Sequence, residues 1–147
     1  MIKIKFKKLS KDAVIPTKGR AGDACFDLYA AEDAVVVEWQ TSLVKTNIAM
    51  EIPEGYFGKI YTRSGMALSG WETTGWIIDS NYRWDVGVLI RHIYTGWYVE
   101  SRNEHHIQKG DRIAQLAIHK VEDVEFEEVE ELSDTIRGEQ GYGSSGV

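Results

Sequence analysis

The sequence predicts an all-β domain, built as a sandwich or a barrel. Two observations favour this fold class. Short runs rich in β-branched and aromatic residues recur along the chain, and turn-forming residues separate them. No long stretch keeps a spacing of 3.6 residues between its apolar positions, so no long amphipathic helix is expected.

Length and composition are those of one globular domain. The chain has 147 residues, of which 43% are hydrophobic and 27% charged, so it can form a core without disulfide staples. No apolar run approaches the length of a membrane span, and the lysine-rich N-terminal stretch lacks the apolar core of a secretory signal. The single cysteine, Cys25, fits a reducing compartment. We therefore expect a cytoplasmic protein with no membrane partner.

The net charge of −6 disfavours binding to long nucleic acids, because their affinity depends on neutralisation of phosphates by lysine and arginine. It is compatible with a small anionic ligand, since a few arginines, backbone amides or a metal ion can hold one. We expect no nucleic-acid partner.

The elements follow in order along the chain. Apolar residues and lysines alternate over residues 2–7, which predicts a half-buried strand. The residues from 10 to 22 form a loop. Further predicted strands share short length, β-forming composition and flanking turns; they are 24–30, 35–38, 43–52, 56–62, 76–78, 86–93, 96–99, 112–121 and, with less β character, 125–129. Residues 66–68 fit one helical turn.

Two segments near the end of the chain have an unusual composition. Residues 122–131 contain seven acids, which favours a solvated edge strand or helix. From Arg137 onward the sequence is rich in glycine and has little to bury, so residues 137–147 are predicted to be a mobile arm beside a domain of residues 1–136. The arm carries an arginine, an aromatic residue and two hydroxyls, which suits a lid over a phosphorylated, planar ligand.

Residues 75–88 predict a β-hairpin with Asp79, Tyr82 and Arg83 at its tip, because an apolar run enters an acid, a turn and a second apolar run. Asp79 fits the role of a general base. The alternative is that Asp79-Ser80-Asn81 serves only as a turn, which these residue types favour.

Arg63-Ser64-Gly65 follows the strand predicted at 56–62. It fits an anion-binding loop, in which Arg63 supplies a planar fork, Ser64 a hydroxyl, and Gly65 room for backbone amides to approach a phosphate. A surface turn is the alternative.

Gln115 lies in the strand predicted at 112–121. Strand alternation would place it on the same face as Ile113, with Arg112 and Ala114 on the other face. A neutral polar group beside an apolar one needs a partner, either a ligand or a water. His105-His106 is predicted to lie in a surface loop, since adjacent residues of an extended segment point in opposite directions and make poor co-ligands of a metal.

Five segments, in this order, resemble the motifs of the trimeric dUTPase family. They are residues 24–30 (ACFDLYA), 63–67 (RSGMA), 78–83 (IDSNYR), 110–116 (GDRIAQL) and 137–146 (RGEQGYGSSG). The resemblance extends from about residue 20 to the end of the chain. It implies a distorted jelly-roll β-barrel that forms a homotrimer with active sites at subunit interfaces. The implied reaction is the hydrolysis of dUTP to dUMP and pyrophosphate with Mg²⁺.

The resemblance also implies roles for the residues of the barrel. Asp79 would hold the water that attacks the α-phosphorus, and Gln115 would bind the α-phosphate or that water. Tyr82 would pack under the deoxyribose, and Asp27 would support the metal site through water. The implied substrate contacts that remain in the barrel are Arg63, Ser64 and Gly65, from a neighbouring subunit, and Ile78.

In the arm, the resemblance implies that Arg137 reaches the γ-phosphate and that Tyr142 stacks on uracil. Ser144 and Ser145 would cap the phosphates, with Gly143 beside the substrate. The arm would then close over the active site.

The chain departs from the usual family pattern in the third motif, where Trp76 and Trp84 stand at positions commonly held by glycine. Trp76 would change either the pocket for the base or only its outer rim. Two other functions stay open: a dCTP deaminase-like enzyme of the same fold, and a non-catalytic regulator that binds a protein partner.

Overall fold

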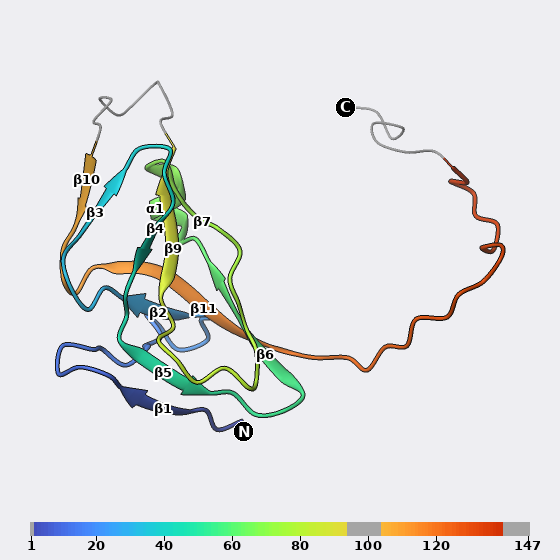
Figure 1. Ribbon diagram of the computed structural model, residues 1–147, viewed down its shortest axis with the longest axis horizontal. Helices are drawn as coiled ribbons and strands as arrows, with labels where there is room; N and C mark the ends of the chain where they lie inside the picture. The colour runs from blue at the N-terminus through green and yellow to red at the C-terminus, as the bar shows by residue number, and fades with distance from the viewer. Residues whose placement is uncertain (1, 94–103, 140–147) are drawn as a thin grey trace.

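The computed structural model describes residues 2–93 and 104–139, and the regular secondary structure of this part of the chain is strand except for one short helix (Figure 1). The prediction of an all-β domain is confirmed. No helix in the described residues is long and apolar enough to cross a membrane. The elements, in chain order, are β1 (Lys5–Lys8), β2 (Phe26–Tyr29), β3 (Ala34–Val37), β4 (Ser42–Val44), β5 (Ile48–Glu51), β6 (Tyr56–Tyr61), α1 (Ser64–Leu68), β7 (Trp71–Thr73), β8 (Ile77–Ile78), β9 (Val88–His92), β10 (Glu104–Ile107) and β11 (Arg112–Lys120).

The strands pair antiparallel with partners that are distant in sequence, as in a distorted jelly-roll barrel. The largest sheet has the order β2-β11-β6-β8, and a second sheet has the order β4-β9-β7. β1 pairs with β5, and β3 pairs with β10. Strand alternation turns every second residue inward, as in β9, where Val88, Ile90 and His92 are buried. The pairs enclose a single core of aliphatic side chains.

The strand predicted at 43–52 is interrupted, and the structure gives β4 and β5 in its place. Asn47 adopts a left-handed backbone conformation with φ of 52° at the break. The buried hydroxyl of Thr46 donates to the carbonyl of Val86 at 2.8 Å and accepts from the N–H of Ile48 at 3.2 Å. These side-chain bonds replace ladder bonds, so the chain turns from one sheet to another.

The hairpin predicted at 75–88 is wrong. β8 pairs with β6, whereas β9 pairs with β4 and β7, so the segment between them crosses from one sheet to another. The N–H of Val86 donates to the carbonyl of Ile48 at 2.8 Å, which draws the second half of the segment toward β5. Asp79 therefore lies in a crossover turn and not at a hairpin tip.

The other differences lie near the ends of the chain. Residues 125–129 form no strand and are exposed; Phe126 is 96% exposed, and Figure 1 shows this segment leading away from the barrel. Its acids repel one another and no described strand pairs with it. The sequence missed β7, and it placed His105 and His106 in a loop, whereas both lie in β10. The strand predicted at 96–99 lies outside the described residues. The helical turn at 66–68 belongs to α1.

Candidate active site

A cavity of about 680 Å³ opens where the chain leaves β6 and enters α1. It brings together five of the residues that the sequence singled out, from three separate segments. These are Asp27, Arg63, Ser64, Gly65 and Gln115. The lining also contains Arg20, Asp23 and Arg112, so three arginines face two aspartates. The net positive lining favours an anionic ligand in a chain that is acidic as a whole.

Asp27 holds two guanidinium groups in this cavity. Its Oδ1 accepts a hydrogen bond of 2.9 Å from Arg63 Nε, and its Oδ2 lies 3.5 Å from Arg112 Nη1. Arg63 also donates to the carbonyl of Arg112 at 3.3 Å. The side chain of Asp27 is 13% exposed and that of Arg63 is 26% exposed. The carboxylate therefore fixes the direction in which Arg63 presents its remaining donors.

The strand register places Gln115 beside this ion pair. In the central strand β11, Gln115 lies opposite Asp27 of β2 on one side and opposite Tyr61 of β6 on the other. Its Nε2 donates to the carbonyl of Thr62 at 3.0 Å. This bond orients the amide at the point where β6 ends, next to Arg63.

The prediction that Arg112 and Gln115 face opposite sides of their strand is wrong, because both line the same cavity. The register of β11 against β2 shifts between Arg112 and Ala114, where Arg112 lies opposite Tyr29 and Ala114 opposite Leu28. Such a bulge changes which side the following residues face. Arg112 was missed as a site residue for this reason, since strict alternation gave no signal for it.

Ser64 and Gly65 lie in the first turn of α1, at the edge of the cavity. Both are exposed, and a Cβ added to Gly65 would meet no atom within 4 Å. Arg63 is the N-cap, and its carbonyl accepts from the N–H of Ala67 at 2.9 Å. The N–H groups before Ala67 have no acceptor within the helix. Open backbone donors next to an oriented arginine favour the anion-binding interpretation over a plain surface turn.

Asp79 lies outside this cavity. It follows β8, is exposed, and its carbonyl accepts from the N–H of Tyr82 at 3.1 Å in a tight turn. It lines a second cavity of about 400 Å³ together with Tyr56, Phe57 and Ser80. Asp79 can therefore both form the turn and act as the general base, because the turn leaves its carboxylate open to solvent.

The two cavities lie at opposite ends of β6. Ile78 pairs with Gly58 near the start of β6, so Asp79 lies next to Phe57, whereas Arg63 lies two residues beyond the other end of β6. Six residues of extended chain span about 20 Å. Within one chain the structure therefore does not bring Asp79 together with Arg63 and Gln115.

The residues around Asp79 differ in what they offer a ligand. The side chain of Ile78 is buried in the core, so only its backbone faces outward. Tyr82 is half-buried and donates from its hydroxyl to the carbonyl of Asp85 at 2.9 Å. Burial, and then the charge of Asp85, raise the pKa of Tyr82, so its phenol is neutral. Trp76 packs against the core, while Trp84 is 73% exposed.

The predicted arm is described only at its start. Arg137 is exposed in the structure. Tyr142, Gly143, Ser144 and Ser145 lie outside the described residues.

The sequence and the fold of the chain are similar to those of known proteins. A family model described as dUTPase matches residues 11–146. The deoxyuridine 5'-triphosphate nucleotidohydrolase of Corynebacterium glutamicum is 43% identical over 147 residues, which cover 97% of this chain and 94% of that protein. The dUTPase of Staphylococcus bacteriophage 80alpha, solved with dUPNHPP, has a TM-score of 0.85 and 32% identity, with 99% of each chain covered. A mutant dUTPase from phage phi11 of S. aureus, solved to show the coordination of a structural Mg(II) ion, has a TM-score of 0.77 and 26% identity, covering 88% of this chain and 97% of that one.

Proposed function

Because the chain belongs to the dUTPase family, we propose that it hydrolyses dUTP to dUMP and pyrophosphate. The observation that carries this proposal is the cavity beside β6. There, an arginine oriented by Asp27 lies next to open backbone donors and to Gln115. This combination suits a chain of phosphates, because phosphoryl transfer depends on positioning and charge stabilisation more than on covalent catalysis.

The chemical step we propose uses a water molecule and Asp79. Asp79 accepts a proton from the water, whose oxygen forms a bond to the α-phosphorus. The bond between the α-phosphorus and the oxygen that bridges to the β-phosphorus breaks, so pyrophosphate leaves and dUMP keeps the new oxygen. An exposed carboxylate at a turn can take this proton without reorganisation of the barrel.

The separation of Asp79 from Arg63 supports active sites shared between subunits. Arg63, Ser64, Gly65 and Gln115 line one cavity, whereas Asp79 lies about six strand residues away along β6 (roughly 20 Å). We propose that a homotrimer joins the Asp79 turn of one chain to the phosphate cavity of another. Homo-oligomers with closed symmetry commonly build such sites at their interfaces.

Selectivity for the sugar and the base is assigned to the turn after β8. We propose that the ring of Tyr82, held by its bond to the carbonyl of Asp85, packs under the deoxyribose and leaves no room for a 2′-hydroxyl. The backbone of Ile78 would read the base, because the side chain of Ile78 is buried. Since Trp76 packs inward against the core, we assign it to the support of this turn and not to the pocket itself.

The residues fit Mg²⁺ in an indirect role. Both oxygens of Asp27 already bind guanidinium groups, which disfavours Asp27 as a direct ligand but leaves lone pairs to accept hydrogen bonds from metal-bound water. Mg²⁺ keeps several waters and binds through phosphates in such sites. Bound to the phosphates, the ion would neutralise charge in the transition state.

We further propose that residues 1–136, whose last barrel strand ends at Lys120, form the catalytic domain and that residues 137–147 close over the substrate. Arg137 would contact the γ-phosphate and Tyr142 would stack on uracil, with Gly143, Ser144 and Ser145 around the phosphates. Such closure excludes water from the reaction. Tyr142→Ala is then expected to weaken substrate binding by about 1–3 kcal/mol, the contribution of one base-aromatic stack.

The test is a nucleotide panel of dUTP, dCTP, dTTP and UTP with product detection, run in water enriched in ¹⁸O. The expected result is turnover of dUTP, with the label in dUMP and none in pyrophosphate. Asp79→Asn should abolish it. Label in pyrophosphate would exclude attack at the α-phosphorus, ammonia from dCTP would show a deaminase, and full turnover by Asp79→Asn would refute the assigned base.

A further inference from the structure

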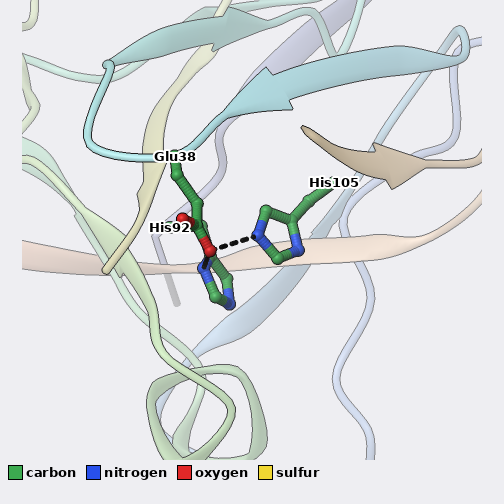
Figure 2. A group of neighbouring side chains, drawn as sticks. All are labelled: Glu38, His92 and His105. Carbon is green, nitrogen blue, oxygen red and sulfur yellow. Dashed lines mark hydrogen bonds and ion pairs between the residues drawn. The ribbon is translucent and has the colours of Figure 1, made fainter. Parts of the chain in front are cut away.

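Three potential metal ligands from distant parts of the sequence meet where β3, β9 and β10 come together (Figure 2). Glu38 directly follows β3, His92 ends β9, and His105 lies within β10. One ligand atom of each residue lies within 4.8 Å of the other two. Figure 2 shows the carboxylate of Glu38 facing a nitrogen of each imidazole ring. None of the three residues has a role in the proposed hydrolysis.

Two of the three distances between the ligand atoms approach those of a metal centre, and the third is no longer than 4.8 Å. Oε1 of Glu38 lies 3.3 Å from His105 Nε2 and 3.8 Å from His92 Nδ1. Ligand atoms of a tetrahedral zinc ion are about 3.3 Å apart when each bond is about 2.0–2.1 Å. The first pair has this spacing, which is also that of the hydrogen bond between the two groups, and the second pair is 0.5 Å wider. Because the two rings are stacked with an interplanar angle of 25°, binding of one ion requires one ring to tilt so that both nitrogen lone pairs point at it.

The hydrogen bonding of His92 leaves one ring nitrogen without a partner. Its Nε2 lies 3.0 Å from the carbonyl of Ser69, which only accepts, so Nε2 carries the proton and donates. In the neutral ring Nδ1 then carries a lone pair. This atom is buried and has no hydrogen-bond partner among the described residues, although it faces the carboxylate of Glu38. A lone pair that faces a carboxylate is repelled unless a proton or a metal ion lies between them.

The side chains of the cluster pack closely against one another and against an aromatic ring. The two imidazole rings stack with their centroids 3.6 Å apart, and Trp71 packs edge-on against both. The side chain of Glu38 is 9% exposed, so its charge also lies largely out of water, where it needs a positive partner.

The backbone around the cluster is held in place. Trp39, directly after Glu38, adopts a left-handed conformation with φ of 65°, and its N–H donates to the carbonyl of His92 at 3.1 Å. Such a conformation costs energy for a bulky residue and persists where the structure requires it. The consequence is that Glu38 and His92 are fixed next to each other before any ligand binds.

We propose that Glu38, His92 and His105 form a binding site for one divalent transition-metal ion, with Zn²⁺ as the best match. Two imidazoles and one carboxylate, with a water in the fourth position, make a common zinc ligand set. Imidazole nitrogen selects such metals over Mg²⁺, which prefers oxygen ligands, so this site is separate from any Mg²⁺ that acts with the substrate.

Binding at this site would stabilise the region next to the phosphate cavity. His92 bonds to Ser69, which lines that cavity directly after α1, and Trp71 lines it as well. Ser69 and Trp71 form part of the cavity wall. A metal ion bound between β3, β9 and β10 would therefore stabilise this wall from the side that faces away from the cavity. The expected effect is on stability, because the reacting groups lie elsewhere.

The experiment uses the full chain without an affinity tag, stripped of metal with a chelator. Titration with Co²⁺ should give the strong visible absorption of a tetrahedral ion, saturating at one ion per chain. Zn²⁺ should displace Co²⁺ and raise the temperature of thermal unfolding by a few degrees, because it binds the folded state. Mg²⁺ at the same concentration should do neither.

Two variants and a matched control locate the site. His105→Gln and Glu38→Gln should each lose the Co²⁺ absorption and the Zn²⁺-dependent rise in unfolding temperature. Glu38→Gln preserves the shape of the side chain. If a histidine variant fails to fold, Glu38→Gln therefore still shows whether these residues bind the metal ion. His106→Gln is the control, because His106 is the exposed neighbour in the same strand; it should bind Co²⁺ as the original chain does.

Three results would overturn the proposal. They are no saturable Co²⁺ absorption in the original chain, unchanged absorption in Glu38→Gln, and equal loss in His106→Gln and His105→Gln. The first would mean that the three residues are only a buried hydrogen-bonded cluster. None of these readouts depends on nucleotide hydrolysis.

Discussion

Arg63 Nε and Asp27 Oδ1 are joined by a hydrogen bond of 2.9 Å that reaches across β11, from β2 to the second residue after β6. Gln115 of β11 lies opposite Asp27 in the sheet. The ion pair therefore links three strands at the edge of the cavity and orients the guanidinium before a substrate arrives. Pre-orientation of this kind lowers the entropic cost of binding.

The variant Asp27→Asn should destabilise the barrel by about 1–3 kcal/mol, the usual cost when a half-buried charged group loses its partner. The amide still fits the space, but it no longer balances the charges of Arg63 and Arg112. Urea denaturation followed by fluorescence measures the change. The Michaelis constant for dUTP should also rise, because the direction of Arg63 is no longer fixed.

Glu51→Gln is the matched control for Asp27→Asn. Lys5 and Glu51 form an ion pair of 2.7 Å on the surface, where side-chain exposure is 77% and 43%. Exposed pairs contribute little to stability because water and salt screen them. The unfolding midpoint of Glu51→Gln should stay near that of the original chain. If Asp27→Asn has the same unfolding midpoint as the original chain, the ion pair of Asp27 and Arg63 has no structural role.

A second prediction concerns pH and the carboxyl group of Asp85. Burial raises the pKa of Asp85 above the ordinary value of 3.8, although Thr46 and two backbone N–H groups partly oppose the shift. Between the unfolded and folded pKa values the native state binds more protons than the unfolded state. The free energy of unfolding should therefore fall as the pH rises through this window.

The measurement for Asp85 is urea denaturation at a series of pH values from just below 3.8 upward. Asp85→Asn has no proton to lose, so its stability should decline less across the same range than that of the original chain. The difference between the two proteins isolates the contribution of Asp85 from that of the other carboxylates. Parallel curves for the two proteins would show that Asp85 does not titrate in this way.

The parts of the fold that follow from local pattern were predicted from the sequence. The alternation of residues in β9 and the apolar run of β11 place both strands, and turn residues bound them. The parts that depend on partners distant in sequence were not predicted. β8 pairs with β6 and not with β9, because Val86 bonds to Ile48, and nothing within residues 75–88 specifies that bond.

The candidate site shows the same limit. The order of the motifs singled out Asp27, Arg63 and Gln115 as candidates, but no local signal marked Arg112, which lines the same cavity after a bulge in β11. His105 was interpreted together with its neighbour His106, while its actual companions are Glu38 and His92. The pattern of residues along one strand shows which side chains lie on the same face of that strand. Which strands lie next to each other depends on the sheet order, which the local pattern does not contain.

A third prediction concerns Gly70, which adopts φ of 82° between α1 and β7. A Cβ there would lie 2.6 Å from the carbonyl oxygen of Ile93 and 3.1 Å from His92 Nε2. Gly70→Ala therefore combines a strained backbone with a clash, and it should cost about 2 kcal/mol or more. Thermal and urea denaturation measure this loss.

Gly75→Ala is the control for Gly70→Ala. A Cβ at Gly75 would meet no atom within 4 Å, and its φ lies outside the left-handed region. Its stability should change little. If Gly70→Ala unfolds at the same urea concentration as Gly75→Ala, the carbonyl of Ile93 does not pack tightly against Gly70 in solution.

The fourth prediction tests whether active sites are shared. Asp79→Asn and Arg63→Ala should each be inactive alone, because each lacks one half of every site. If Asp79 of one chain serves the cavity of another, mixed trimers contain sites with both residues intact. Random assembly from equal amounts of the two chains gives about one quarter of sites in this state. Co-refolding the two variants should therefore restore about a quarter of the original activity.

The controls for this mixing experiment separate assembly from chemistry. Chains with both substitutions, mixed with either single variant, should regain nothing, because no site can then be complete. Exchange of subunits is verified by native mass spectrometry of chains that differ in mass. If subunits exchange freely and the two single variants stay inactive together, Asp79 and Arg63 must act within one chain. The separation of the two cavities along β6 makes that outcome incompatible with this barrel, so the experiment tests the fold and the site together.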